Sequence, residues 1–327
     1  MAVRPPYNFA RLRFIFERDG IDLFLNGTVL RLEMGNGNEV VAAVCQMSDG
    51  RTARVRARKF VLATGGIENP RLLLASGLGN EHDQVGRCFM NHPKGYAGRL
   101  ILRKPLPITS PYLPRSVNGR MIYAGLVLSE DTRRARGLLS SYVQFEPDLG
   151  FLQRYAFGIW RRLPTFIAPL FNLLRPRTLR LRWYADMEPR TENYIRLGER
   201  KDMFGMPLPA VTYALGPRDA ETLRTLHAQL TEEIDRLGLG RVEGSANAVV
   251  AAASQDASHY LGGTRMGRNP RTSVVDPNCK VHTISNLYIA GGSVFATSGS
   301  ANPTYTIIAL AIRLAKHLKQ ELMARSA

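Results

Sequence analysis

The 327-residue sequence contains no G-x-G-x-x-G stretch, the glycine loop that seats a nucleotide pyrophosphate between a strand and a helix. Its three cysteines, Cys45, Cys88 and Cys279, are widely spaced and form no C-x-x-C pair, which argues against a disulfide framework and a cysteine zinc site. No run reaches the roughly twenty apolar residues that a membrane-spanning helix needs. The histidines show no metal-ligand spacing such as H-E-x-x-H. We expect a protein without a bound metal, in a reducing compartment such as the cytoplasm.

Acidic side chains are also scarce, 27 against 44 basic ones, which gives a formal charge of +17. Such a charge favours contact with anions: nucleotide phosphates, acidic sugars, nucleic acid or lipid headgroups. Nucleic-acid binding is not expected, because the sequence shows neither a recognisable motif nor an aromatic platform for it. The N-terminus lacks the apolar region and cleavage site of a secretory signal.

A basic and apolar segment, residues 151–183, stands apart from the rest. Arginines bracket a proline-interrupted stretch rich in Phe and Leu, with Trp160, Phe166 and Phe171 as candidate anchors. A lid, a surface for a partner and a contact with a membrane surface are all consistent with this pattern.

Strand patterns dominate the N-terminal part, where IDLFLNGTVLRLEM, EVVAAVCQM and TARVRARKFVLAT follow one another between residues 21 and 64. Glycine-rich turns separate them, so we predict a three-stranded meander. The last run, residues 60–63, is apolar without alternation, which predicts a strand buried on both faces. It leads through Gly65 and Gly66 into RLLLAS, where Pro70 marks the start of a short helix.

The pattern changes between about residues 95 and 250. RLILRK, MIYAGLVLS and SSYVQF alternate as antiparallel strands do, and ETLRTLHAQLTEEIDRLG repeats its apolar positions at helical spacing. We predict a second domain, built on an antiparallel sheet flanked by helices. The remaining part, from His259, contains a strand-like stretch at 286–290 and a helix after Pro303.

Two polar side chains in glycine-rich turns suit the removal of hydride from an alcohol: His259 in HYLGGTRMG and Asn302 in GGSVFATSGSANPT. A neutral imidazole can accept the hydroxyl proton while a carboxamide holds the same oxygen. Taken alone, His259 is better explained as a histidine bonded within its glycine-rich loop, and Asn302 as a helix N-cap. Asn302 followed by Pro303 predicts the start of a helix whose positive end can face an anion.

Three blocks resemble the glucose-methanol-choline (GMC) oxidoreductases: FVLATGGIENPRLLLASGLG (60–79), VGRCFMNHPKG (85–95) and the region from His259 to Thr304. A weaker likeness covers 188–209. Gly66 and Asn69 differ from the usual residues of the first block, Asn91 stands where Asp is usual, and Gly291 stands where many relatives have Asp.

The resemblance implies an α/β (α+β) fold that combines part of an FAD-binding domain with a substrate domain. Its segments would be 1–95 (FAD domain), 96–252 (substrate domain) and 253–327 (the C-terminal return to the FAD domain). It implies FAD as cofactor and a small-molecule alcohol or sugar as substrate, with His259 as base and Asn302 as its partner. The implied cofactor-binding residues are Gly65, Gly66, Asn69, Gly291, Gly292, Ser293, Asn302, Pro303 and Thr304. His92 is interpreted either as a turn histidine or as a residue beside the flavin.

The family carries its glycine loop near its start, and this sequence does not contain one. Three hypotheses therefore stand: an FAD-dependent enzyme part, a split enzyme in which a separate N-terminal FAD-binding chain supplies the loop, and a catalytically silent basic module. A silent module would bind an anionic surface or a partner protein.

Overall fold

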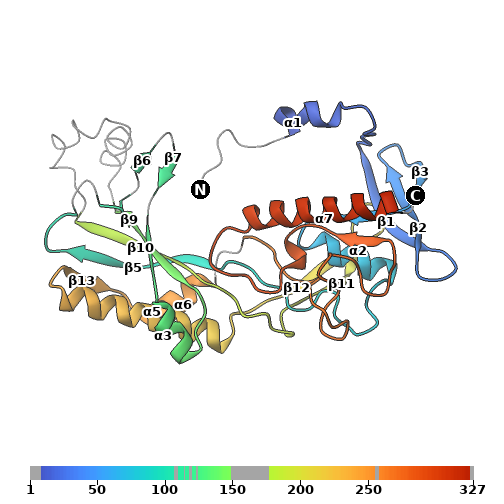
Figure 1. Cartoon of the computed structure of the whole chain (residues 1–327). Helices are drawn as coiled ribbons and strands as arrows, with labels where there is room; N and C mark the ends of the chain where they lie inside the picture. The colour runs from blue at the N-terminus through green and yellow to red at the C-terminus, as the bar shows by residue number, and fades with distance from the viewer. Residues whose placement is uncertain are drawn as a thin grey trace. The chain divides into compact units, whose positions relative to one another are not determined.

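The computed structural model describes residues 9–106, 110–113, 115–117, 120–122, 124–148, 177–254 and 258–324 (Figure 1). The chain divides into two compact units, each made of discontinuous segments. Unit 1 comprises Met1–Leu23, Pro93–Ala185 and Pro217–Asp256, and unit 2 comprises Phe24–His92, Asp186–Gly216 and Ala257–Ala327.

Unit 2 begins with the predicted meander. Strands β1 (Gly27–Met34), β2 (Val40–Met47) and β3 (Thr52–Val55) pair antiparallel in sequence order. Strands β11 (Tyr194–Lys201) and β12 (Pro207–Thr212) form a hairpin. Its turn is held by Asp202, whose Oδ1 accepts from the backbone amides of Phe204 and Met206.

The third predicted strand proved to be two. Strand β3 ends at Val55, and β4 (Phe60–Leu62) instead pairs in parallel with β14 (Leu287–Ile289), which lies within the predicted strand-like stretch. The prediction that this run is buried on both faces is wrong. Phe60 and Leu62 are buried, but Val61 is 43% exposed.

Helices complete unit 2. Helix α2 (Glu68–Ser76) follows β4, ends at Gly77 in the left-handed conformation, and buries Leu72 and Leu73. The short 3-10 helix η2 (Gly292–Val294) follows β14, and the long helix α7 (Thr304–Ala324) follows later. One hydrophobic core joins residues of α2, the β4–β14 pair and α7, including Leu73, Leu287 and Leu314.

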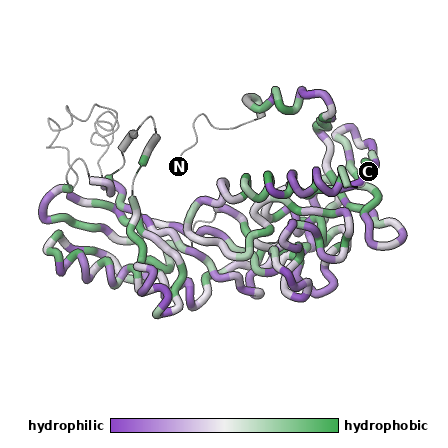
Figure 2. Tube along the Cα trace, in the orientation of Figure 1, coloured by the Kyte–Doolittle hydropathy of each residue, from purple (hydrophilic) through white to green (hydrophobic). Residues whose placement is uncertain are grey.

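Unit 1 contains the predicted antiparallel sheet, five strands in the order β13-β5-β10-β9-β8. Their bounds are β5 Lys94–Leu102, β8 Gly125–Val127, β9 Tyr142–Pro147, β10 Thr178–Tyr184 and β13 Gly240–Glu243. In β10, Leu179, Leu181 and Trp183 are fully buried and alternate with partly exposed arginines. Green and purple bands along these strands show the alternation (Figure 2).

Helices α5 (Pro217–Arg236) and α6 (Ala246–Ala253) pack with this sheet, α6 against β5 and α5 against α6 and β13. The predicted helix is confirmed as the larger part of α5, which begins earlier, at Pro217. The shorter elements of unit 1 are α1 (Phe9–Phe16), β6 (Arg115–Val117), β7 (Arg120–Ile122) and α3 (Glu130–Arg136). Of the basic segment 151–183, residues 151–176 lie outside the described residues and 178–183 belong to β10.

Among the helices of the described residues, none combines the length and the apolar character required to cross a bilayer.

Candidate active site

The carboxyl ends of β4 and β14 meet at one edge, because the two strands run parallel. Asn69, at the start of α2 and fully buried, joins the two loops that follow them. Its Oδ1 accepts from the amide of Thr64 (2.9 Å) and from the Thr64 hydroxyl (2.6 Å). Its Nδ2 donates to the carbonyl of Ala290 (3.0 Å) and to Ser293 Oγ (2.8 Å). The structure thus brings the predicted residues of both loops together.

Two of the predicted cofactor-binding glycines have a protein neighbour that accounts for their missing side chains. A Cβ at Gly66 would lie 2.2 Å from the carbonyl oxygen of Tyr260, and a Cβ at Gly292 would lie 2.8 Å from the same atom. A passing backbone segment therefore requires glycine at both positions.

Gly65 and Gly291 are different, because they adopt φ angles of 102° and 108°, which favour glycine. Among the described residues, no atom lies within 4 Å of a Cβ built at Gly65. Nucleotides bind beyond the carboxyl ends of parallel strands, so the open space beside Gly65 fits one part of FAD. A glycine loop for the pyrophosphate is not in this sequence.

The segment 258–264 lies between two other stretches of unit 2. On one side the amides of Met90 and Leu261 exchange hydrogen bonds with each other's carbonyls, and His92 N donates to Ser258 O. On the other side Gly262 N donates to Gly292 O and Thr264 N to Ser293 O. This pairing joins residues about 170 positions apart and places His92 next to His259.

The two histidines are in direct contact. His259 Nδ1 lies 3.2 Å from His92 Nδ1, and the rings are nearly perpendicular, at 80°. His92 is buried, and its Nε2 lies 3.3 Å from the carbonyl oxygen of Ser298. His259 has a φ of 78°, which is unusual for a residue with a side chain and is frequent at functional sites.

With both rings neutral, these contacts fit one arrangement of protons. A carbonyl oxygen only accepts, so His92 Nε2 carries a proton and donates it to Ser298 O. The neutral His92 ring then accepts at Nδ1, and His259 Nδ1 is the donor. In this arrangement Nε2 of His259 carries no proton.

The loop that precedes α7 is anchored by Ser298. Its hydroxyl donates to Asp186 Oδ1 (2.5 Å) and accepts from the amide of Met187 (2.9 Å). Asn302, four residues later, is exposed, and its side chain makes no hydrogen bond with the described residues. Pro303 O accepts from Ile307 N, and α7 begins at Thr304, directly after Pro303.

Sequence reasoning missed the contact that His92 makes with His259. The NHP triplet is the only local signal, and it suits a turn as well as a site. Ser298 and Asp186 were also missed, since a buried serine–aspartate contact leaves no local pattern. Within the part of the chain that the structure describes, no group of three or more His, Cys, Asp or Glu side chains could hold a metal.

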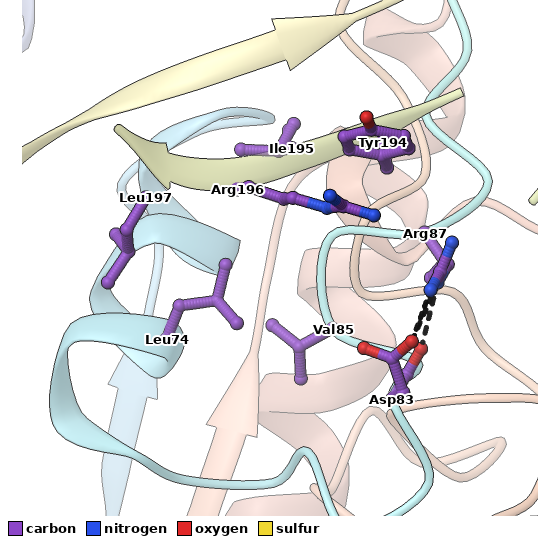
Figure 3. Close-up of a pocket in the computed structure, with 8 residues that line it drawn as sticks. All are labelled: Leu74, Asp83, Val85, Arg87, Tyr194, Ile195, Arg196 and Leu197. Atoms are coloured by element: carbon purple, nitrogen blue, oxygen red, sulfur yellow. Dashed lines mark hydrogen bonds and ion pairs between the residues drawn. The ribbon is translucent and has the colours of Figure 1, made fainter. Parts of the chain in front are cut away.

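A separate cavity of about 280 Å³ lies in unit 2 between α2 and β11 (Figure 3). Leu74, Val85 and Ile195 line its apolar part, and Arg196 packs 4.0 Å from the centre of the Tyr194 ring. Arg87 pairs with Asp83 at the rim. None of the predicted site residues lines this cavity.

The chain is similar to known proteins. Two family models, both described as GMC oxidoreductase, match residues 9–94 and 189–311. The fructose dehydrogenase large subunit of Gluconobacter japonicus is 28% identical over 97% of this chain and 57% of its own length. Paromamine 6'-oxidase of Streptomyces fradiae is 31% identical over 90% of this chain and 52% of its own.

Solved structures share the fold. Pyridoxine 4-oxidase from Mesorbium loti superposes with a TM-score of 0.61 and 19% identity, covering 94% of this chain and 60% of that chain. Formate oxidase gives a TM-score of 0.57 and 17% identity, over 94% and 62%. The chain spans about half the length of the curated relatives it matches.

Proposed function

Because the chain belongs to the GMC oxidoreductase family, we propose that it carries the catalytic part of an FAD-dependent enzyme that oxidises an alcohol. The proposed substrates are sugars, polyols and related alcohols. Relatives named fructose dehydrogenase, paromamine 6'-oxidase and C-glycoside 3-oxidase support this class. The observation that carries the proposal is the contact between His92 and His259 beside the loop that leads to Asn302.

FAD, when bound, supplies the acceptor for the hydride of the alcohol carbon. His259 accepts the hydroxyl proton at Nε2. The proton on its Nδ1 remains hydrogen-bonded to His92 Nδ1. The Asn302 carboxamide donates to the alcohol oxygen and so orients it. The positive end of α7, which begins at Thr304, favours negative charge near it. Asn69 holds the two loops at the carboxyl ends of β4 and β14 in register for the cofactor.

Substitution of the base tests the proposal. With FAD bound, His259→Ala should slow reduction of the flavin by substrate about 100-fold or more, while the substrate dissociation constant changes little. Stopped-flow absorbance at the flavin band measures both quantities. His82→Ala, an exposed histidine of unit 2, is the matched control. Equal reduction rates in wild type and His259→Ala would exclude His259 as the base.

A second candidate function is the binding of an anion at the cavity of Figure 3. It is favoured by the charge of +17 and by Arg196, for which no carboxylate partner is found among the described residues. Under this hypothesis Arg196→Ala would abolish binding of inorganic phosphate, measured by calorimetry, and flavin would not bind at all. A visible flavin spectrum of the protein assembled with a glycine-loop segment would favour the enzyme instead.

A further inference from the structure

Asp186 is a buried carboxylate that the proposed reaction does not use. The residue is 9% exposed and lies two positions after the end of β10. Its Oδ1 accepts from the hydroxyl of Ser298 at 2.5 Å, a length typical of a hydroxyl bound to a carboxylate. Two carbonyl oxygens, those of Met187 and Gly299, lie farther from this hydroxyl, at 3.3 Å each. A hydroxyl has one proton to donate, so Asp186 is its acceptor.

The Ser298 hydroxyl is held from two sides. It donates to Asp186, and it accepts from the amide of Met187 at 2.9 Å. Ser298 is itself buried, and all three residues belong to unit 2. A buried hydroxyl that both donates and accepts has little freedom to rotate, and such networks make their surroundings rigid. The backbone of Ser298 is therefore fixed relative to the segment that contains Asp186.

Met187, the residue after Asp186, lies in an apolar cluster. It is almost fully buried and packs with Met90 and Leu261, which are fully buried. Met90 lies two residues before His92, and Leu261 lies two residues after His259. The segment that contains Met187 is thus packed against both stretches that carry the histidine pair.

The carbonyl of Ser298 connects this arrangement to the histidines. His92 Nε2 lies 3.3 Å from the carbonyl oxygen, and His92 Nδ1 lies 3.2 Å from His259 Nδ1. Since a carbonyl only accepts, this contact favours a proton on Nε2 of His92. In the neutral ring Nδ1 is then the acceptor for His259. The position of one carbonyl therefore selects the tautomer of His92.

We propose that Asp186 is a positioning residue for the proposed base, His259. By holding the Ser298 hydroxyl, Asp186 places the carbonyl that keeps the proton of His92 on Nε2. His92 then accepts at Nδ1 from His259. The same loop leads to Asn302, four residues after Ser298, so a displaced loop would move both proposed catalytic groups. The role in catalysis rests on the proposed function, whereas the effect on the His92 tautomer does not.

Nitrogen-15 NMR of the histidine rings in the whole chain tests this proposal without flavin or substrate. The signal of His92 is assigned by its absence in His92→Phe. In wild type, Nε2 of His92 should be protonated. Asp186→Ala removes the acceptor of the Ser298 hydroxyl, so Nε2 of His92 should become partly unprotonated. Asp186→Asn keeps an oxygen that can accept and should give the wild-type signal.

Ser298→Ala is a smaller change that breaks the same hydrogen bond from its other side. It should alter the His92 signal as Asp186→Ala does, and the double variant should show no larger effect, because both substitutions act through one contact. With FAD bound, each single variant should slow reduction of the flavin by substrate about tenfold or more, because the proposed base is misplaced.

Asp202→Ala is the matched control. Asp202 also holds a loop of unit 2, since its carboxylate accepts from the amides of Phe204 and Met206 and from Arg71. None of these partners is a predicted site residue. The substitution should lower the stability of the chain and leave the His92 signal unchanged, which separates positioning from a general loss of stability.

Two results would overturn the proposal. One is a wild-type His92 signal in both Asp186→Ala and Ser298→Ala, and the other is an equal change of that signal in Asp202→Ala. The tautomer is measured without turnover, so either result is distinguishable from a failed assignment of His259 as the base.

Discussion

His92 is the residue that orients the proposed base. Its Nε2 is committed to the carbonyl of Ser298, and its Nδ1 faces His259 Nδ1 at 3.2 Å. A positioning residue of this kind acts through the tautomer of its neighbour, as the carboxylate of a catalytic triad does. The effect of replacing it should therefore be visible in the imidazole itself as well as in the rate.

His92→Phe removes the His92 ring nitrogen that faces His259 Nδ1, so both tautomers of His259 should become populated. We expect flavin reduction about 10- to 100-fold slower than in wild type. Nitrogen-15 NMR of the imidazole measures the tautomer directly and should show Nε2 of His259 unprotonated in wild type and partly protonated in His92→Phe. His82→Phe should change neither quantity. A single unchanged tautomer in His92→Phe would refute this role.

Asn69 contributes through four hydrogen bonds made in a fully buried position. Asn69→Ala leaves the Thr64 amide without its acceptor and should lower the free energy of unfolding by about 2–3 kcal/mol. Hydrogen exchange at Thr64 and Ser293, with urea unfolding, measures the change. Asn278→Ala, an exposed position, serves as control. If the Thr64 amide keeps its protection in Asn69→Ala, the two loops do not depend on this side chain.

At the scale of elements, helix α7 is attached near its end by a partly buried ion pair. Lys59, before β4, is 7% exposed and donates to Glu321 (2.5 Å) and to Tyr288 Oη (3.1 Å). Burial by itself raises the pKa of Glu321, but the bonds from Lys59 and Tyr288 outweigh it and lower the pKa from 4.5 to about 2. The folded pKa is thus lower than the unfolded one.

The sign of the pH effect follows from this difference. The pair stabilises the fold fully above pH 4.5, and the contribution disappears as the pH falls toward 2. Because the carboxylate is 30% exposed and therefore partly screened, Glu321→Gln should cost about 1–2 kcal/mol at pH 7 and little near pH 2. Urea unfolding between about pH 2 and pH 7 measures how this cost depends on pH. Glu199→Gln, at an exposed position, is the control. A cost independent of pH would contradict the assignment.

Elements whose signals lie within a short stretch of sequence were predictable. The β1–β2–β3 meander has glycine turns between its strands, and α5 repeats its apolar positions at helical spacing. The break between β3 and β4 was not predictable, since β4 pairs with β14, more than 200 residues away. Helix α6 also escaped prediction, because ANAVVAAA is apolar on most of its surface and shows no clear period.

The candidate site was likewise only partly predictable from the sequence, because part of it depends on long-range pairing. His259 and Asn302 are marked by their glycine-rich turns, but the contact of His92 arises from the pairing of residues 85–92 with 258–264. The family resemblance implies that Gly66 and Gly292 lie beside a ligand. The backbone of Tyr260, a long-range neighbour, is what excludes a side chain there.

At the scale of the whole molecule, the chain passes repeatedly between two units, each with buried residues of its own. In unit 1 these include Trp183 and Leu223, and in unit 2 Leu73 and Leu287, all fully or almost fully buried. Chains with more than one compact unit often depart from two-state unfolding. Local stability should therefore be set within each unit.

Leu223→Ala in α5 tests this independence. Truncation of a fully buried leucine should cost about 3 kcal/mol, because it removes apolar contacts and leaves a cavity. Hydrogen exchange should show the loss of protection in α5, α6 and β5, while β14 and α7 keep theirs. Leu287→Ala should give the reverse pattern, since Leu287 belongs to the core of unit 2. Equal loss of protection throughout the chain in either variant would mean that the units unfold as one cooperative structure.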